Sequence, residues 1–449
     1  MNDITAIFAF LKYCLGYKGN MSRVIAGMDW QELYSFASKQ ALLGLCFEGI
    51  ERLGKEYPEE LKQNPIGREL LMTWMGKAQQ IRRQNMKVNA VAGKLFSMLR
   101  EDGLRCCILK GQGNTLMYPN PYSRTPGDID VWIDASRERI MEYAQKKFEL
   151  GDDIRLQHLE TSLDSVPVEL HFFPCSMNNP IYHTRLQKWF KRNADLQCSN
   201  VVGLPDGAWD IAIPTMAFNV VYQLTHLYHH FFDEGIGMRQ IIDYFLVVCD
   251  FYKVYQKSSN PSVSLSKGSS TFSPSPSSSG SGDVTAPSRC SEPLCSKVGG
   301  PSKVSPNCAG WDRRGVSGDT SSVSCSSASG SSASTALVVV QRELKYLGLW
   351  KFAGAVMYVL YEALGLSEEK MIAPMDEKRG KLLLAEILEG GNFGRHFTKY
   401  GGFTHQSMGK KYFLKIWRNM HFVRYYPAEA LCEPIFRTWH FFWRMKNKK

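Results

Sequence analysis

The chain has 449 residues, which is too many for one compact core and indicates two or three domains of about 100 to 200 residues each. With 44% hydrophobic and 22% charged residues, the composition is that of a globular protein and excludes a wholly disordered, collagenous or fibrous chain. The formal net charge of +11 permits a polyanionic partner such as nucleic acid, a membrane surface or a nucleotide, without choosing among them.

The sequence shows neither a membrane-spanning segment nor a signal peptide, and both features bear on the cellular compartment. No stretch approaches the roughly 18 to 20 consecutive apolar residues that a bilayer crossing requires, and the first residues lack the order of a signal peptide. The 12 cysteines include no C-x-x-C motif and are typical of reduced, mostly buried thiols. The loose group Cys290, Cys295, Cys308 and Cys325 fits no compact zinc pattern. We therefore expect a cytoplasmic protein without a membrane partner.

The N-terminal part of the chain, residues 1–103, carries apolar residues at three- and four-residue spacing, which predicts helices. The last of these helices is long and ends at Gly103, a typical helix stop. Residues 104–200 change to short β-branched or alternating runs bounded by Gly, Pro, Asp and Ser, which predict strands. The predicted strands are CCILKG, DIDVWID, DDIRLQHLE and VPVELHFF, with one helix, SRERIMEYAQKKFEL, between the second and the third.

Two further helical regions, residues 201–257 and 336–449, flank a segment of different composition. In that segment, residues 258–335, more than a third of the residues are serine, with Gly and Pro interspersed. It cannot bury enough apolar surface to offset the entropy of ordering it, so we expect a disordered insertion within one helical domain. The sequence thus predicts an α+β fold in which a small mixed β-sheet core is embedded in helical N- and C-terminal regions.

The strand that follows Gly127 brings acidic residues together. Its alternation places Asp128 and Asp130 on one face and Ile129 and Val131 on the other, which points into the core. The two carboxylates then lie about 7 Å apart by strand rise. Negative charges at this separation favour a divalent cation between them. An isolated D-x-D motif more often simply faces water at an exposed strand edge.

A second strand, within residues 166–172, has the same alternation and places Glu169 and His171 on one face. If this strand lies beside the first, Asp128, Asp130 and Glu169 form a cluster able to hold two Mg²⁺ ions. Two such ions stabilise the attacking and leaving oxygens of phosphoryl transfer. The pair of strands therefore indicates a phosphoryl-transfer site.

A phosphate-binding turn is the next requirement, and the segment from Lys110 to Asn114 is a candidate. It follows an apolar strand and offers small residues at a strand-to-helix turn, where backbone N–H groups can bind phosphate oxygens. It is not a Walker A loop, because Lys110 precedes the glycine and no G-K-[ST] follows. A plain turn is the alternative interpretation of this segment.

The order of these motifs resembles the polymerase-β-like nucleotidyltransferase superfamily, and within it the bacterial nucleotidyltransferase-like family. The matching residues are Leu109-Lys110-Gly111, Arg124, Asp128-Ile129-Asp130 and Glu169-Leu170-His171, followed by His226-Leu227-Tyr228-His229-His230 and the segment from Arg239 to Asp243. The likeness covers most of the chain apart from the serine-rich insertion. It implies that residues 104–200 are a nucleotidyltransferase sheet core.

The resemblance implies transfer of a nucleoside monophosphate from a nucleoside triphosphate such as ATP to an acceptor hydroxyl, with release of pyrophosphate. Asp128 and Asp130 would hold two ions, Mg²⁺ or Mn²⁺, and Glu169 would complete the ligands of the catalytic ion and help deprotonate the acceptor. Catalysis would consist mainly of positioning and charge neutralisation. The residues expected to bind the nucleotide are Lys110, Gly111, Gln112 and Arg124.

His171, His226 and Arg239 are candidates for the rim of the substrate site. His171 shares a strand face with an acid and can touch metal or substrate. His226 belongs to an aromatic-rich helix, where histidines more often serve packing. Arg239 and Asp243 are four residues apart, a spacing that can also simply stabilise the helix.

Two alternatives remain open. In the superfamily the turn glycine is usually followed by glycine or serine, whereas here Gln112 follows Gly111, so a catalytically silent member that binds a nucleotide or a partner is one alternative. A nucleic-acid-binding module is the other, but its basic residues would gather on one face, and here they are scattered. Because no base-reading motif is present, we favour a small-molecule or protein acceptor over nucleic acid.

Overall fold

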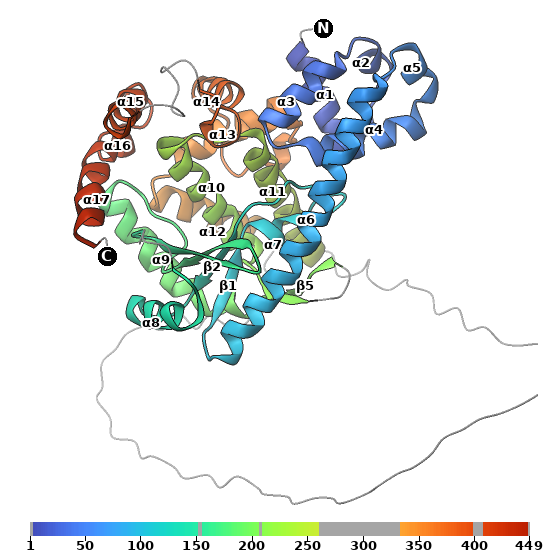
Figure 1. Cartoon of the computed structure of the whole chain (residues 1–449). Coiled ribbons are helices and arrows are strands. Elements are labelled where there is room, and N and C mark those ends of the chain that lie inside the picture. The colour runs from blue at the N-terminus through green and yellow to red at the C-terminus, as the bar shows by residue number, and fades with distance from the viewer. Residues whose placement is uncertain (1–2, 151–154, 206–208, 260–332, 398–406, 448–449) are drawn as a thin grey trace, which may run out of the picture. The chain divides into compact units, whose positions relative to one another are not determined.

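A four-stranded mixed sheet forms the middle of the fold, with the strand order β1-β2-β4-β3 (Figure 1). Its strands are Cys106–Leu109 (β1), Ile129–Ile133 (β2), His158–Leu163 (β3) and Val166–His171 (β4). β1 runs antiparallel to β2, β2 runs parallel to β4, and β4 runs antiparallel to β3. The prediction of a small mixed sheet within an α+β fold is therefore confirmed.

The computed structural model describes residues 3–150, 155–205, 209–259, 333–397 and 407–447. The insertion predicted for 258–335 lies, apart from its ends, outside the described residues, and so does the cysteine group between 290 and 325. Helix α11 (Met238–Ser259) reaches the start of this segment and α12 (Ala333–Tyr346) begins at its end. These two helices pack against each other, so the chain leaves and re-enters the same helical region.

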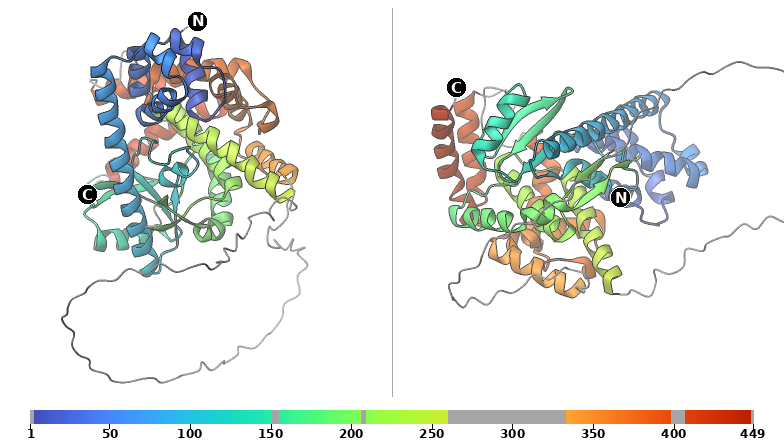
Figure 2. Two further views of the ribbon diagram at one scale, coloured as in Figure 1. Left: turned by 90° about the vertical axis from the view of Figure 1, so that its right-hand side faces the viewer. Right: turned by 90° about the horizontal axis from the view of Figure 1, so that it is seen from below.

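Among the described residues, six helices precede the sheet, in agreement with the helical spacing of residues 1–103. They are Asp3–Cys14 (α1), Ser22–Ala26 (α2), Trp30–Lys39 (α3), Leu43–Glu56 (α4), Pro58–Gln63 (α5) and Arg68–Glu101 (α6). Helix α6 has 34 residues and is followed by Gly103, whose φ of +74° suits glycine. It packs against α4 at one end and against β1 at the other, as Figure 2 shows, and so connects the N-terminal helices to the sheet.

One face of the sheet forms a hydrophobic core with two helices. Val131 of β2 and Leu170 of β4 are fully buried there, together with Leu95 of α6 and Ile140 of α8 (Arg137–Lys147). This is the face on which the alternation of the sequence places the apolar residues. The acidic residues of the same two strands therefore project from the opposite face.

The opposite face is covered by aromatic packing at one end of β2. The ring of Trp132 lies 6.1 Å from that of Phe190 in α9 (Pro180–Ser199) and 6.2 Å from that of Phe218 in α10 (Met216–Asp233). This packing holds α10 beside the sheet. The acidic end of β2 lies beyond these rings, where α10 continues past it with its histidines.

The C-terminal part is helical, as predicted. After α12 the helices are Trp350–Leu364 (α13), Glu377–Gly390 (α14), Met408–Met420 (α15), Pro427–Ala430 (α16) and Glu433–Asn447 (α17). One departure from the sequence prediction precedes them, because Val201–Gly203 (β5) and Asp210–Ala212 (β6) form a short antiparallel pair where helix is expected. No helix in the described part of the chain combines the length and the apolar character that a bilayer crossing demands.

The third strand is also displaced from its predicted position. The run DDIRLQHLE predicts a strand that ends at Glu160, whereas β3 continues to Leu163 and only begins at His158. A tight turn explains the shift. Asp164 and Ser165, with φ of +48° and +63°, reverse the chain into β4, so the pairing with β4 determines where β3 lies.

Candidate active site

The turn after β1 has an unusual backbone. Lys110 has a φ of +42° and Gly111 one of +48°, which lead into the short helix α7 (Gly111–Thr115). A positive φ in a non-glycine residue costs about 1 to 3 kcal/mol, and such strain is concentrated at functional sites. The turn aims the Lys110 side chain at the acidic strand, where its Nζ lies 3.1 Å from Asp130 Oδ2.

Three carboxylates meet beside this lysine. The parallel pairing of β2 and β4 places Asp130 directly opposite Glu169, and Asp128 immediately precedes β2. One carboxylate oxygen from each of the three lies within 4.8 Å of the others. Asp128 is exposed, Glu169 is partly buried and Asp130 is only 2% exposed. The structure thus brings together the three acids that the strand alternation places on one face.

A buried histidine joins this acidic cluster. His171 Nε2 lies 3.1 Å from Asp130 Oδ1 and 3.1 Å from Glu169 Oε2. Burial disfavours a charged imidazole, but the hydrogen bonds with the two carboxylates outweigh burial and raise the pKa of His171 to about 9. The pKa of Glu169 is lowered, since the hydrogen bond with His171 outweighs burial. His171 and Lys110 thus neutralise part of the negative charge.

The Lys110 ammonium also reaches the opposite wall, which is formed by α10. Its Nζ lies 3.1 Å from His226 Nε2, and His226 Nε2 lies 3.1 Å from His230 Nε2. Burial lowers the pKa of both histidines well below the usual value, and the charge on Lys110 lowers it further. Burial likewise disfavours the charge of Lys110, but Asp130 and the neighbouring acids outweigh it and raise its pKa. The ammonium is therefore the cation that links the two walls.

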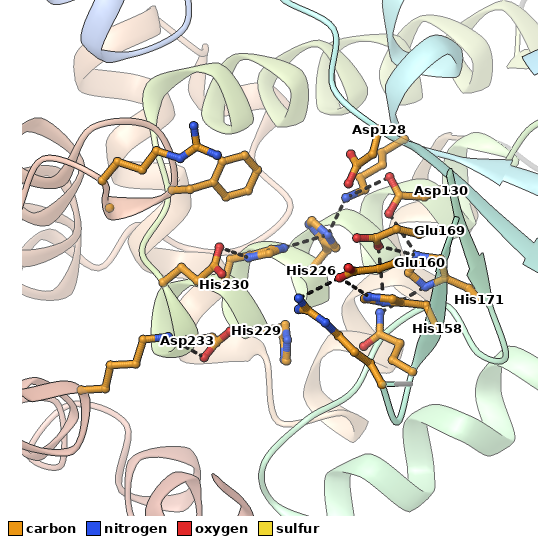
Figure 3. A pocket seen from close by; sticks show the side chains of 18 of the residues that line it. Asp128, Asp130, His158, Glu160, Glu169, His171, His226, His229, His230 and Asp233 are labelled. Atoms are coloured by element: carbon orange, nitrogen blue, oxygen red, sulfur yellow. Dashed lines mark hydrogen bonds and ion pairs between the residues drawn. The ribbon is translucent and has the colours of Figure 1, made fainter. Parts of the chain in front are cut away.

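A cavity of about 610 Å³ separates the acidic wall from the C-terminal helices (Figure 3). Its size is in the range of small-molecule sites. Besides the acids and histidines above, its lining includes Arg155, Gln157, His158, Glu160, His229, Asp233, Glu234, Phe393, Gly394, Arg395, Lys415 and Arg418. Away from the three acids the lining carries both signs, because Lys415 Nζ lies 3.3 Å from Asp233 Oδ1 and Arg395 and Glu234 also line the cavity.

Two arginines predicted for the site lie outside this cavity. Arg124 is 4% exposed, and its Nε and Nη2 donate to the two carboxylate oxygens of Asp243, each at 2.8 Å. The hydroxyl of Tyr118 donates to the same carboxylate at 2.8 Å. Arg239 is 7% exposed and donates to the backbone oxygen of Thr125 at 3.1 Å. Both arginines make structural hydrogen bonds and neither lines the cavity, although each is close enough to Asp128 to feel its charge.

The expected phosphate-binding turn is only partly directed at the cavity. Gln112 is 3% exposed, and its amide donates to Asn89 of α6. Neither Gln112 nor Gly111 lines the cavity, whereas Lys110 does. A glycine is still required at 111, because its φ is positive. The Gln112 side chain therefore joins the turn to α6.

Several residues at this site were not singled out from the sequence. His158 and Glu160 on β3 alternate in step with the face that carries Glu169 and His171, and this parity was the available signal. Arg395 and Lys415 have no such signal, because they follow the insertion and reach the cavity only through the tertiary fold.

The three acids fit a hard divalent cation. Carboxylate oxygens are the ligands that Mg²⁺ and Mn²⁺ prefer, and the spacing within 4.8 Å allows a shared ion. In addition, Asp130 Oδ2 is buried, and apart from the Lys110 ammonium 3.1 Å away it has no hydrogen-bond partner among the described residues. A buried carboxylate oxygen in this state is suited to an ion.

Comparisons with known proteins identify the family of this chain. A family model described as an uncharacterised nucleotidyltransferase matches residues 26–254. No curated protein matches the chain. The solved structure of an antigenic nucleotidyltransferase-like protein from Paracoccidioides brasiliensis is similar, with 16% sequence identity over 36% of this chain and 75% of that chain. Its TM-score of 0.25 is too low to carry an argument about this fold.

Proposed function

This chain belongs to the uncharacterised nucleotidyltransferase family, and on that premise we propose that it transfers a nucleoside monophosphate from a nucleoside triphosphate to a hydroxyl group. One observation carries the proposal. The parallel pairing of β2 and β4 brings Asp130 opposite Glu169, with Asp128 beside them, on the wall of a cavity of about 610 Å³. This is the donor set that phosphoryl transfer requires.

Asp128, Asp130 and Glu169 are the residues that would hold two divalent ions, Mg²⁺ or Mn²⁺. Such ions, when bound, neutralise charge on the attacking and leaving oxygens of an in-line displacement. The acceptor hydroxyl oxygen bonds to the α-phosphorus while the bond from that phosphorus to the bridging oxygen breaks, and pyrophosphate leaves. Glu169, whose pKa is lowered, is ionised and accepts the proton of the hydroxyl.

The triphosphate needs cations as well, and the cavity offers them. Lys110 lies at the acidic wall, 3.1 Å from Asp130, and is placed to contact the phosphate being transferred. Arg395 also lines the cavity and is the residue proposed to neutralise the pyrophosphate portion, whereas Lys415 is paired with Asp233 at 3.3 Å. Arg124 and Gln112, which are engaged with Asp243 and Asn89, are assigned supporting roles in this proposal.

The test is transfer of label from α-³²P nucleotides with Mg²⁺ or Mn²⁺, using small-molecule and protein extracts as acceptor sources. Asp130→Asn should lower the rate at least about 10³-fold, because it removes charge from both proposed ion sites. Asp134→Asn is the matched control, since Asp134 follows the same strand but pairs with Arg105 at the surface. Equal rates for wild type and Asp130→Asn would refute the proposal.

A catalytically silent nucleotide-binding member is the second candidate. It is favoured by the buried Gln112, whose side chain takes the place of the usual small residue after the turn glycine and is unable to contact phosphate. Under this alternative, calorimetry would detect nucleotide binding while no label reached any acceptor. The proposed acceptor of the active enzyme is a small molecule or a protein hydroxyl.

A further inference from the structure

Three residues beside the acidic cluster form a group of different chemistry. His158 on β3 is paired directly opposite His171 on β4, and the ring centroids lie 5.0 Å apart. Glu169 projects from the same face as His171, and its carboxylate lies close to both rings (Figure 3). Its Oε2 lies 3.4 Å from His158 Nδ1 and 3.1 Å from His171 Nε2. Two imidazole nitrogens and one carboxylate thus converge.

The state of His158 needs an explanation. It is 9% exposed, and neither ring nitrogen makes a hydrogen bond. Buried polar groups are normally paired, and leaving one unpaired costs about 1 to 3 kcal/mol. An imidazole nitrogen that carries no proton has a lone pair, and Nδ1 of His158 faces the carboxylate of Glu169 at 3.4 Å. A ligand that accepts this lone pair would satisfy it.

The spacing suits a transition-metal ion. Ligands at about 2.0 to 2.1 Å from a tetrahedral ion lie roughly 3.3 to 3.5 Å from one another. The distances from Glu169 Oε2 to the two ring nitrogens, 3.4 and 3.1 Å, are close to this range. Imidazole nitrogen favours Zn²⁺, Co²⁺ and related ions over Mg²⁺. On the far side of His158, Glu160 Oε1 lies 3.7 Å from Nε2 and is paired with Arg155 at 2.7 Å.

We propose that His158, Glu169 and His171 bind a first-row transition-metal ion such as Zn²⁺, next to the Asp128 and Asp130 carboxylates. Binding replaces the proton that His171 Nε2 shares with Asp130 and Glu169. Glu169 is common to both groups, so the two sites are adjacent. Use of this ion in catalysis rests on the proposed function, whereas its binding does not.

The experiment is a titration of the full-length protein with Co²⁺, followed by visible absorption. A four- or five-coordinate site with nitrogen ligands absorbs strongly, whereas an octahedral all-oxygen site absorbs weakly. We expect one strongly absorbing equivalent, with affinity reduced at least about 100-fold in His158→Gln. Asp128→Asn should keep the spectrum while losing transfer activity, which separates this inference from the proposed function. His183→Gln on α9, outside the cavity lining, is the matched histidine control.

Two outcomes would overturn the proposal. One is a weak spectrum that disappears in Asp128→Asn and is unchanged in His158→Gln, which would place the ion among the carboxylates. The other is the absence of stoichiometric Co²⁺ binding. If His158→Gln fails to fold, His158→Cys provides the test, because a thiolate ligand adds an intense near-ultraviolet band only if position 158 contacts the ion.

Discussion

Two buried pairs of opposite charge in this protein differ in how completely they are satisfied. Arg124 and Asp243 share two hydrogen bonds of 2.8 Å, and Tyr118 supplies a third to the same carboxylate. Lys110 and Asp130 approach to 3.1 Å, and this ammonium is the one partner of Asp130 Oδ2 among the described residues. The carboxylate of the first pair is hydrogen-bonded on both oxygens by side chains of this protein, whereas the second pair faces a cavity.

The difference separates a structural cluster from a site that awaits a ligand. Buried ion pairs with complete hydrogen bonding hold elements together, here the segment before β2 and helix α11. A buried carboxylate with fewer hydrogen bonds stabilises the fold less, so its presence beside a cavity indicates a role other than stability. Each of the following predictions tests the distinction between the structural ion pair and the site at the cavity.

The largest effect is expected from Arg124→Met. Removing the guanidinium leaves the Asp243 carboxylate buried without its charged partner, which should lower the free energy of unfolding by about 3 to 5 kcal/mol. Urea denaturation measures the change. The double variant Arg124→Met/Asp243→Leu should recover much of the loss, because it removes both charges. A loss of nucleotide affinity at unchanged stability would instead make Arg124 a ligand-binding residue.

Lys110→Met should lower the transfer rate and leave the stability nearly unchanged, in contrast to Arg124→Met. We expect transfer to fall about 10- to 100-fold, or about 1.4 to 2.7 kcal/mol in activation free energy, because the cation faces the cavity. Stability should change little, since His171 continues to neutralise Asp130. Transfer rates at saturating nucleotide and midpoints of urea denaturation together separate an effect on activity from an effect on stability. Lys94→Met is a suitable control, as Lys94 pairs with Asp164 at the surface.

The acidic cluster should also make the stability of the metal-free protein depend on pH. The folded pKa of His171, about 9, lies above the usual value of about 6.5. The stabilisation from its protonated form is therefore complete below about pH 6.5 and is lost as the pH rises through about 9. Urea midpoints between pH 6 and 9.5 in the presence of a chelator should show this decline, and His171→Gln should flatten it. A wild-type curve without slope in this range would contradict it.

The smallest effect is expected from replacing residues 260–332 with a short flexible linker. Helices α11 and α12 pack against each other on either side of this segment, so shortening the connection changes only the entropy of loop closure. The free energy of unfolding should change by less than about 1 kcal/mol. Transfer activity should be retained, because neither the acids of the cavity nor its histidines, as described above, belong to residues 260–332. A large loss of activity would assign the segment a direct role.

Strand alternation predicted much of the fold and the acidic cluster. The period of two places Asp128 and Asp130 on one face, and the same period places Glu169 and His171 together. That the two strands are neighbours and run parallel is a tertiary fact, because the sequence left their adjacency as a condition and did not indicate their relative direction. The apolar runs likewise predicted the mixed sheet and the surrounding helices.

The remaining contacts depend on separations that local spacing does not reveal. Spacing of four residues suggested Arg239 as the partner of Asp243, whereas Arg124, 119 residues away, forms the ion pair. Because local spacing does not reveal this ion pair, the sequence predicted that Arg124 binds the nucleotide. The far wall of the cavity, with Arg395 and Lys415, follows the insertion and comes into place only when the helical region folds.

At the start of β2, selection for folding and selection for chemistry act on alternate residues, whereas Trp132, on the same face as Asp130, serves packing. Ile129 and Val131 belong to the core with α6, while Asp128 and Asp130 contribute nothing to it. Relatives could therefore exchange both acids for neutral residues and inherit the architecture unchanged. Relatives that have lost the activity would then differ from active enzymes at positions 128 and 130, while the core positions 129 and 131 stay apolar.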